Sequence, residues 1–447
     1  MKIAIVGCGH VGLVYAAGLA HLGHEVQAFD IDDSRLQQMQ NGEAPFFEPG
    51  LAELLQAEIA GGRLRFSGDI LETLQWSEIV FCTVGTPLID EIVDVSAVYD
   101  VAENFAKVTA QDSLRRFFVL KSTVPVGTSQ KVAEFIREKA LGDGNFELLF
   151  HPEFLREGVA LKDFFEPSRI VMGMEAFDLS PEQIQEKVFE VYEQFVQGKV
   201  PMIFTSLEEA ELIKYVSNAF LAVKISFANE MAQVCDVLGV DVTNVMKGAG
   251  HDPRIGLRFL GAGIGYGGSC LPKDVRALLN LAAEKGLKLE LIEAAEHRNC
   301  AQVLTAIEML EKSLGNLSGK KLAVWGLSYK AETSDIRGSR SVEIIEKLLE
   351  KGAEVCAYDP RAGEVVRKYF GEKVEVLDQS FEAVNGADAL LVLTNWEEFS
   401  HADFNEIFAL MKGKVIFDGR NFLDAKKLRK LGFEYLAIGR SAICGVN

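Results

Sequence analysis

The first thirty residues constrain the fold more than any other part of the chain. A short β-branched apolar run leads into a glycine turn, then into helical spacing and a second strand-like run: KIAIVGCGHVGLVYAAGLAHLGHEVQAFD, residues 2–30. Strands that follow one another through a helix pair in parallel within one sheet. The segment therefore predicts a βαβ unit at the start of an α/β domain.

The glycine turn has the G-x-G-x-x-G spacing of dinucleotide-binding proteins. Gly7, Gly9 and Gly12 stand between strand and helix, where the backbone can approach a pyrophosphate at the helix N-terminus. Asp30 closes the second strand, 18 residues beyond Gly12, so its carboxylate can accept both ribose hydroxyls and repel a 2′-phosphate. This context predicts NAD binding. Arg35 keeps NADP open, because a nearby arginine can accommodate the extra phosphate.

Further short apolar runs, at 78–84, 117–123 and 147–153, alternate with helix-like or loop segments, as in a doubly wound parallel sheet. Two of these runs lead into hydroxyl residues close to a proline, Thr86 and Thr123. Strand ends of a parallel sheet face its ligand crevice, so both residues are candidate cofactor contacts. Ordinary turn chemistry is the alternative.

From Ser206 to about Leu287 the sequence changes to long helix-compatible stretches. Apolar residues recur at three- and four-residue spacing, at Leu212, Ile213, Val216, Phe220, Val223 and Phe227. The pattern predicts a long central helix whose apolar face packs either as core between domains or as a dimer interface.

The strand-then-glycine pattern returns in KKLAVWGLSYK, and LLEKGAEVCAYDP repeats the helix and strand that end in an aspartate. The spacing differs between the two copies: Gly7 to Asp30 is 23 positions, whereas Gly326 to Asp359 is 33. The additional residues fall at the edge of a parallel sheet where ligands bind, so the second copy is expected to bind something other than a dinucleotide.

At 447 residues the chain is longer than one hydrophobic core usually organises. We expect an α/β protein with two Rossmann-like doubly wound parallel-sheet domains joined by a long central helix. The expected divisions are an NAD-binding domain at 1–200, a helical connector and dimerisation region at 201–300, and a second sheet domain at 301–447.

Composition excludes several classes of function. A formal net charge of −19 disfavours sequence-independent binding to nucleic acid or to an anionic membrane. No stretch approaches the roughly 20 uninterrupted apolar residues of a membrane span, and the first apolar run is too short for a signal peptide. The 7 cysteines include no CxxC pair, so neither a disulfide framework nor a metal site is indicated, and a cytoplasmic location fits best.

The segment GAGIGYGGSCLPKD, residues 261–274, is the most informative for chemistry. Five glycines among its first eight residues permit close backbone approach and then present a cysteine. Because Lys273 and Asp274 follow closely, and a cation raises the reactive thiolate fraction, Cys270 is predicted to be a nucleophile. A buried, inert thiol is the alternative, and it is the state expected of the other cysteines: Cys8, Cys82, Cys235, Cys300, Cys356 and Cys444.

Lys214 and Asn218 are one turn apart on the expected central helix and therefore point the same way. They form either a pair directed into a site or a solvated surface pair, and the residues alone leave both open.

Taken together, these motifs resemble the UDP-glucose/GDP-mannose dehydrogenase family over essentially the whole chain. The matching runs, in the order of the family, are G-x-G-x-x-G with Asp30, STVPVGT (122–128), HPEFLREG (151–158), K-x-x-x-N, DPRIG (252–256), GGSCLPKD (267–274) and YKAETSDIRGS (329–339). The arrangement around the cysteine is most similar to members that act on UDP-glucose. GDP-mannose stays an alternative, because GSCLPKDVRAL also occurs in members that act on it and His151 stands where an asparagine is common.

The resemblance implies an NAD-dependent four-electron oxidation of the sugar C6 alcohol to a carboxylate. The aldehyde formed first would be attacked by Cys270 to give a thiohemiacetal, which would be oxidised to a thioester and hydrolysed. Lys214 and Asn218 would stabilise oxyanions at C6. Asp274, Thr123 and Glu153, in that order of preference, would handle protons through an ordered water.

The resemblance also implies the binding residues. Besides the glycine turn, NAD would contact Val11, Asp30, Arg35, Thr86, Thr123, Glu157, Lys273 and Arg337. The nucleotide sugar would contact Glu153, Phe154, Leu155, Arg156, Glu157, Lys214, Asn218, Phe259, Leu260, Gly261, Ala262, Gly263, Gly267 and Lys330. Arg254 would reach across to a neighbouring subunit of a homo-oligomer, at least a dimer.

Two other classes of function are compatible with parts of the sequence. A two-electron β-hydroxyacid dehydrogenase would share the first domain but would leave the cysteine loop and the second sheet without a role. A catalytically silent nucleotide-sugar sensor would need neither the cysteine nor the lysine and asparagine.

Overall fold

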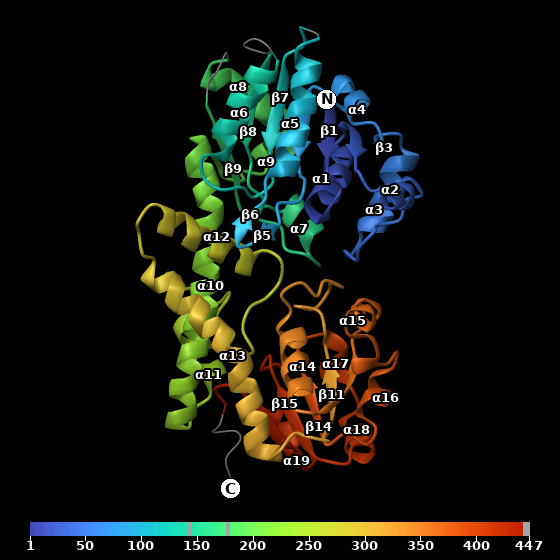
Figure 1. Cartoon of the computed structure of the whole chain (residues 1–447), viewed down its shortest axis with the longest axis vertical. Helices are drawn as coiled ribbons and strands as arrows, with labels where there is room; N and C mark the ends of the chain where they lie inside the picture. The colour runs from blue at the N-terminus through green and yellow to red at the C-terminus, as the bar shows by residue number, and fades with distance from the viewer. Residues whose placement is uncertain (112, 141–144, 176–178, 441–447) are drawn as a thin grey trace. The chain divides into compact units, whose positions relative to one another are not determined.

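The computed structural model describes residues 1–111, 113–140, 145–175 and 179–440, and it divides into two compact units, the first ending at Val216 and the second beginning at Ser217 (Figure 1). The first unit contains β1 (Lys2–Val6), α1 (His10–His21), β2 (Glu25–Phe29), α2 (Asp33–Gln40), α3 (Leu51–Ala60), β3 (Leu64–Ser67), α4 (Ile70–Trp76), β4 (Ile79–Cys82), β5 (Leu88–Ile89), β6 (Ile92–Val93), α5 (Ser96–Thr109), β7 (Arg116–Leu120), α6 (Thr128–Lys139), β8 (Phe146–Phe150), α7 (Ala160–Phe165), β9 (Ile170–Met174), α8 (Pro181–Val191), α9 (Glu193–Gln197) and β10 (Met202–Thr205).

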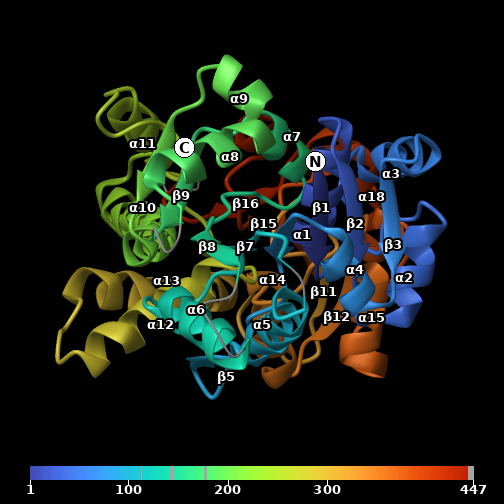
Figure 2. The same cartoon turned by 90° about the horizontal axis from the view of Figure 1, so that it is seen from above.

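The main sheet of the first unit has the strand order β10-β9-β8-β7-β4-β1-β2-β3. From β3 to β8, and between β9 and β10, neighbouring strands are parallel, and among the described strands of this sheet only the pair β8–β9 is antiparallel. The helices α2 and α3 lie beside the β3 edge (Figures 1 and 2). The order reverses between β1 and β4, and this reversal is where doubly wound sheets bind ligands.

The strand β1 explains why the sheet is covered on both sides. Ile3 and Ile5 belong to the hydrophobic core on one face, and Ala4 and Val6 belong to the core on the other. Alternate residues of a strand point to opposite faces, so an uninterrupted apolar run is stable only between two layers.

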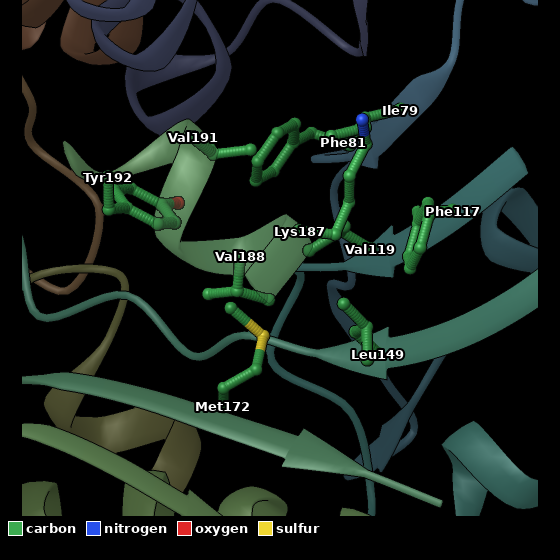
Figure 3. A pocket seen from close by; sticks show the side chains of 10 residues that line it. All are labelled: Ile79, Phe81, Phe117, Val119, Leu149, Met172, Lys187, Val188, Val191 and Tyr192. Carbon is green, nitrogen blue, oxygen red and sulfur yellow. The ribbon is translucent and has the colours of Figure 1, made fainter. Parts of the chain in front are cut away.

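A small apolar cavity lies on the first of these faces, beneath α8. Figure 3 shows its lining side chains, which come from α8 and the strands below it: Ile79, Phe81, Phe117, Val119, Leu149, Met172, Lys187, Val188, Val191 and Tyr192. It is a packing space within the core and lies away from the glycine turn.

The helix α10 (Leu207–Leu238) begins in the first unit and continues into the second. The second unit then contains α11 (Val242–Gly250), α12 (Leu271–Glu284), α13 (Glu290–Leu314), β11 (Lys321–Trp325), α14 (Arg340–Glu350), β12 (Glu354–Tyr358), α15 (Gly363–Phe370), η1 (Gly371–Lys373), β13 (Glu375–Val376), α16 (Ser380–Val384), β14 (Ala389–Val392), α17 (Glu397–His401), α18 (Phe404–Leu410), β15 (Val415–Asp418), α19 (Ala425–Lys430) and β16 (Glu434–Ala437).

The second sheet repeats the topology of the first. Its order is β13-β12-β11-β14-β15-β16, which corresponds strand for strand to β3-β2-β1-β4-β7-β8. Every pair is parallel, and α13 lies alongside α14. The predicted fold class, two Rossmann-like sheet domains with a long central helix, is confirmed.

The helix α10 contradicts one of the two expectations about its apolar residues. Leu212, Val216, Phe220 and Phe227 are exposed, so they do not form core between domains, whereas the dimer interface stays a prediction. Alanines and polar side chains of α10, such as Ala222 and Asn229, are buried instead. Over the residues that the structure describes, no helix is both long enough and apolar enough to cross a membrane.

Candidate active site

The glycine turn of the first unit leaves its backbone open on one side. Gly7 has φ +97°, and a Cβ on Gly12 would lie 1.9 Å from the Gly7 carbonyl oxygen, so neither position accepts a side chain. Gly9 is the N-cap of α1, and a Cβ there would meet nothing within 4 Å. Val11 lies partly buried in the first turn of α1. The turn has the shape that a pyrophosphate needs at a helix N-terminus.

Asp30 lies buried at the end of β2 and supports this turn. Its Oδ2 accepts from the Cys8 N–H at 2.8 Å, and its Oδ1 accepts from the Asp32 N–H at 3.0 Å. Each carboxylate oxygen therefore keeps acceptor capacity for a ribose hydroxyl. The Arg35 guanidinium donates to the Cys8 carbonyl at 2.8 Å, so part of its donor capacity is used on the turn itself. The residues present fit NAD.

The matching aspartate of the second sheet is saturated. Asp359 accepts at Oδ1 from two backbone N–H groups and at Oδ2 from four donors, which are Leu327 N, Ser328 N, Ser328 Oγ and Trp396 Nε1. A carboxylate with six donors has little capacity left for a ribose. This difference agrees with the expectation that the second copy does not bind a dinucleotide.

The loops after β4 and β7 meet. The Thr86 hydroxyl donates to the Thr123 carbonyl at 2.8 Å, and the Ser122 hydroxyl donates to the Val84 carbonyl at 2.6 Å. Further along, the buried Glu211 of α10 accepts from backbone N–H groups at the start of α6. The two strand-end threonines predicted from sequence therefore belong to one connected set of loops.

The loop after β8 contains a buried ion pair. The Lys214 ammonium donates to Oε1 of Glu153 and to its carbonyl oxygen, both at 2.7 Å, and the Leu155 N–H donates to Oε2. Lys214 is 3% exposed. Burial alone would raise the pKa of Glu153, but the charge and hydrogen bond of Lys214 hold that pKa below its ordinary value.

The residues after Glu153 contact several different parts of the first unit. The Phe154 ring lies 3.7 Å from the Arg169 guanidinium carbon and 5.5 Å from the Lys214 ammonium. Arg156 forms an exposed ion pair with Asp163. Glu157 lies 3.9 Å from Nδ1 of His10, at the N-terminus of α1. This segment therefore connects the ion pair to the glycine turn.

A second buried polar group lies in the second unit. The Asn218 amide nitrogen donates to Oδ2 of Asp274 at 2.6 Å, and the Lys273 ammonium lies 2.9 Å from Oδ1. Asp274 is 1% exposed and Asn218 is 8% exposed. Cys270, the N-cap of α12, is exposed, and its carbonyl oxygen accepts from the Asp274 N–H at 2.9 Å. The partial positive charge of a helix N-terminus stabilises an anion there.

The alternative that Lys214 and Asn218 form a solvated surface pair is wrong. Both side chains are buried and bonded to carboxylates, while Phe220, two residues beyond Asn218, is 63% exposed. Helical spacing correctly placed the two polar residues on one side of α10, but that side is the covered one.

The glycines of the 261–268 loop serve close packing within the second unit. A Cβ on Gly263 would lie 2.4 Å from the Gly419 carbonyl oxygen, and one on Gly267 would lie 2.1 Å from the Gly338 carbonyl oxygen. At Gly261 a Cβ would meet nothing within 4 Å. The glycine content therefore has a packing cause, and the substrate contact at this loop stays a prediction.

Helices on both sides hold the start of this loop. The Gly263 N–H donates to Asn229 of α10, and Gln302 of α13 donates to the Gly263 carbonyl. Leu260 and Ala262 are buried in the adjoining core. Phe259 adopts a left-handed φ of +64°, which an ordinary residue holds only where its surroundings impose it.

The remaining predicted contacts also lie in the second unit. Lys330 follows β11, with its ammonium 5.7 Å from the Tyr329 ring centre. Arg337 and Arg254 each form an ion pair with an aspartate two residues earlier in the chain. The latter pair leaves the Arg254 side chain 88% exposed.

A partly buried cation beside the cysteine loop was missed by the sequence analysis. The Arg420 guanidinium donates to the carbonyl oxygens of Leu393, Gly265 and Tyr329, and so joins the cysteine loop to the segment before Lys330. Burial, and then the charge of Arg340, lowers the pKa of Arg420 to about 10. The dipeptide Arg420-Asn421 after a short strand has no spacing signature, so only packing reveals it.

The cysteines require one correction. Cys8, Cys82, Cys235 and Cys356 are buried, as predicted, whereas Cys300 on α13 is exposed. Its position on the outer side of a long helix decides this, and cysteine content alone could not. Cys444 lies outside the described residues.

We expect Asp30→Asn to weaken NAD binding by about tenfold or more, because a hydrogen bond to a charged acceptor contributes roughly 1.5–3 kcal/mol. Fluorescence titration with NADH measures the affinity. The matched substitution in the second sheet, Asp359→Asn, should leave NAD affinity unchanged while lowering the thermal midpoint. Equal losses of affinity in both variants would contradict the assignment of the cofactor to the first sheet.

Three models of one family match the chain in order. The NAD binding domain of the UDP-glucose/GDP-mannose dehydrogenase family matches residues 1–196, the central domain matches 208–301, and the UDP binding domain matches 323–425. UDP-glucose 6-dehydrogenase TuaD of Bacillus subtilis is 38% identical over 100% of this chain and 95% of its own length.

Solved structures agree with these matches. A UDP-glucose dehydrogenase from Pyrobaculum islandicum is 36% identical with a TM-score of 0.89, covering 98% of this chain and 97% of its own. A UDP-D-ManNAc dehydrogenase from Pyrococcus horikoshii is 28% identical with a TM-score of 0.85, covering 99% and 100%. The chain therefore belongs to the UDP-glucose/GDP-mannose dehydrogenase family, and it is an NAD-dependent nucleotide-sugar dehydrogenase.

Proposed function

We propose that this chain oxidises the C6 alcohol of UDP-glucose to the carboxylate of UDP-glucuronate through a thioester at Cys270. The observation that carries the proposal is an exposed cysteine at the N-terminus of α12, four residues before a buried carboxylate that both Asn218 and Lys273 hold in place. A fixed carboxylate one helical turn after an exposed cysteine suits a reaction that needs both a nucleophile and a proton acceptor.

NAD, when bound, accepts a hydride in each of the two oxidation steps. In the first step C6 loses a hydride, and the alcohol proton passes to a water held by Asp274, leaving an aldehyde. The Cys270 thiolate then adds to the aldehyde carbon, forming a C–S bond and an oxyanion that takes up a proton to give a thiohemiacetal.

Loss of the second hydride and of the hydroxyl proton converts the thiohemiacetal to a thioester. Water attacks the thioester carbon, the C–S bond breaks, and the carboxylate leaves while Cys270 recovers its thiolate. Each sugar therefore loses four electrons and uses two NAD.

Lys214 and Asn218 supply the oxyanion donors in this proposal. A fixed donor aimed at a developing oxyanion is worth about a hundredfold or more in rate, since its orientation costs nothing at the moment of reaction. The ammonium of Lys214 and the amide of Asn218 are already held by Glu153 and Asp274. Asp274 ranks first as the group that handles protons, followed by Thr123 and Glu153.

The binding residues predicted from sequence remain proposals. In the first unit we assign NAD to the glycine turn with Asp30, because that carboxylate keeps free acceptor capacity. In the second unit we assign the substrate diphosphate to Lys330 and add Arg420, since two cations near one loop offset the strongly negative net charge. The three-part division at 1–200, 201–300 and 301–447 and a cytoplasmic location are likewise proposed.

UDP-glucose is favoured because the named relatives with high coverage include UDP-glucose dehydrogenases. A relative named for UDP-D-ManNAc and the family's second substrate, GDP-mannose, define the alternatives. With purified protein we expect two NADH per UDP-glucose consumed, followed at 340 nm, and little turnover of GDP-mannose or of UDP-N-acetylmannosamine.

Each other outcome of this assay points to a different function. Turnover of GDP-mannose but not of UDP-glucose would show that GDP-mannose is the substrate. One NADH per substrate would indicate a two-electron dehydrogenase, and no turnover of any nucleotide sugar would indicate a silent sensor.

Cys270→Ser should abolish net uronate formation while leaving secondary structure and NAD binding intact, because a hydroxyl at neutral pH is a far weaker nucleophile than a thiolate. Product chromatography, circular dichroism and NADH titration measure the three properties. Cys300→Ser, at another exposed cysteine, serves as the control and should retain full activity. Wild-type rates in Cys270→Ser would remove the covalent mechanism.

We also propose that the exposed side of α10 binds a second copy of this chain. Phe220, Phe227 and Val234 recur at seven-residue spacing and are all exposed, which forms an apolar stripe along the helix. Light scattering should report a dimer for the wild type and a monomer for Phe227→Asp. Val365→Asp, at an exposed position on α15, should stay dimeric, and a monomeric wild type would exclude the proposal.

A further inference from the structure

Two lysines hold the same short turn after β8 by donating to alternate carbonyl oxygens. The Lys121 ammonium donates to the carbonyl of His151 at 3.2 Å, and the Lys214 ammonium donates to the carbonyl of Glu153 at 2.7 Å. Lys121 follows β7 directly and is 1% exposed. The catalytic mechanism proposed above uses Lys214 but gives Lys121 no role.

Apart from Lys214 and Glu153, the groups around Lys121 carry no charge. Its ammonium lies 3.9 Å from the centre of the Tyr15 ring. Nδ1 of His151 lies 2.8 Å from the Val171 carbonyl, which can only accept, so Nδ1 carries the proton and Nε2 faces the Tyr15 hydroxyl at 3.5 Å. Burial, and then the charge of Lys121, holds the pKa of His151 well below its usual range, so this imidazole is neutral.

The tyrosines complete the set of titratable groups. Burial raises the pKa of Tyr15 and of Tyr192, whose ring packs against His151 and borders the cavity beneath α8 (Figure 3). Both phenols therefore stay protonated. The cluster consists of two cations, Lys121 and Lys214, and one anion, Glu153, from separate elements of the first unit.

Burying a lysine without a bonded carboxylate is costly, and the cost must be offset by neighbouring charge. Among the described residues Lys121 forms no ion pair of its own. Burial holds the pKa of Lys121 well below its ordinary value, the charge of Glu153 opposes that effect, and the charge of Lys214 adds to it. Lys121 thus interacts electrostatically with Glu153, while its hydrogen bond goes to the carbonyl of His151 in the same turn.

We propose that Lys121 is a positioning residue that keeps Glu153 ionised and in place while the ammonium of Lys214 is shared between Glu153 and the oxygen on C6. The proposal rests on the proposed function, because that function assigns the oxyanion role to Lys214. A single lysine cannot neutralise Glu153 and the reacting oxygen at once. The second, immobile cation removes this conflict.

The charge and the hydrogen bond of Lys121 can be separated by substitution. Lys121→Gln removes the charge but retains a donor for the His151 carbonyl, and Lys121→Arg retains the charge. An opposite charge nearby lowers a carboxyl pKa by about one to three units, so its loss raises the pKa of Glu153. The ionised fraction of Glu153 then falls at low pH and recovers at high pH.

We therefore expect the acid limb of the kcat–pH profile to move upward by about one unit in Lys121→Gln, with KM for the nucleotide sugar unchanged. Lys121→Arg should restore the wild-type position. Tyr15→Phe keeps the ring beneath the ammonium and serves as the control with an unmoved profile. A uniform loss of kcat at every pH in Lys121→Gln, with no movement of the limb, would show a merely structural role and overturn the proposal.

A second measurement does not depend on turnover and so separates this inference from the proposed function. Thermal midpoints are compared at pH 7 for the wild type, Lys121→Gln, Glu153→Gln and the double variant. The decrease in thermal midpoint caused by Lys121→Gln should be at most half as large in the Glu153→Gln background as in the wild type. Additive losses would overturn the coupling, whether or not the protein turns over UDP-glucose.

Discussion

Parallel pairing of strands is the constraint on which the rest of the structure depends. A parallel neighbour can be reached only through a crossover, so the strands from β1 to β8 in the first sheet all run in the same direction. Their carboxyl ends therefore lie along one edge of the sheet. Loops from different parts of the chain are therefore collected at one edge: the glycine turn after β1, Asp30 after β2, and Thr123 after β7. Coverage of both faces leaves this edge as the place for polar chemistry.

The polar groups that α10 carries are arranged in buried pairs rather than exposed singly. Lys214 is held by Glu153 from the loop after β8, and Asn218 is held by Asp274 from the first turn of α12. A hydrogen bond to a buried charged group is stronger than one in water, and breaking it leaves that charge without its partner. These pairs therefore fix the positions of the lysine and the amide, which would be mobile in solvent. The same helix, α10, carries both donors one turn apart.

Duplication of the sheet did not duplicate the site. Both copies have a glycine turn after the first strand and an aspartate after the second, but Asp30 keeps acceptor capacity while Asp359 is saturated by six donors. The Leu327 N–H corresponds to the Cys8 N–H of the first copy, and the donors that only Asp359 has come from Ser328, Ala362 and Trp396. One fold thus supports a cofactor aspartate in one copy and a structural aspartate in the other.

Local sequence alone determined the two sheets, the glycine turns, the long central helix and the positions of Cys270 and Asp30, because strand alternation, helical periodicity and glycine spacing act over a few residues. It could not determine which side of α10 is covered, since periodicity shows only which residues share a face. Packing buried Lys214 and Asn218 and exposed Phe220 and Phe227. Only the tertiary structure brought Lys121 to the His151 carbonyl and Arg420 to the cysteine loop, because these contacts join residues that no short-range pattern links.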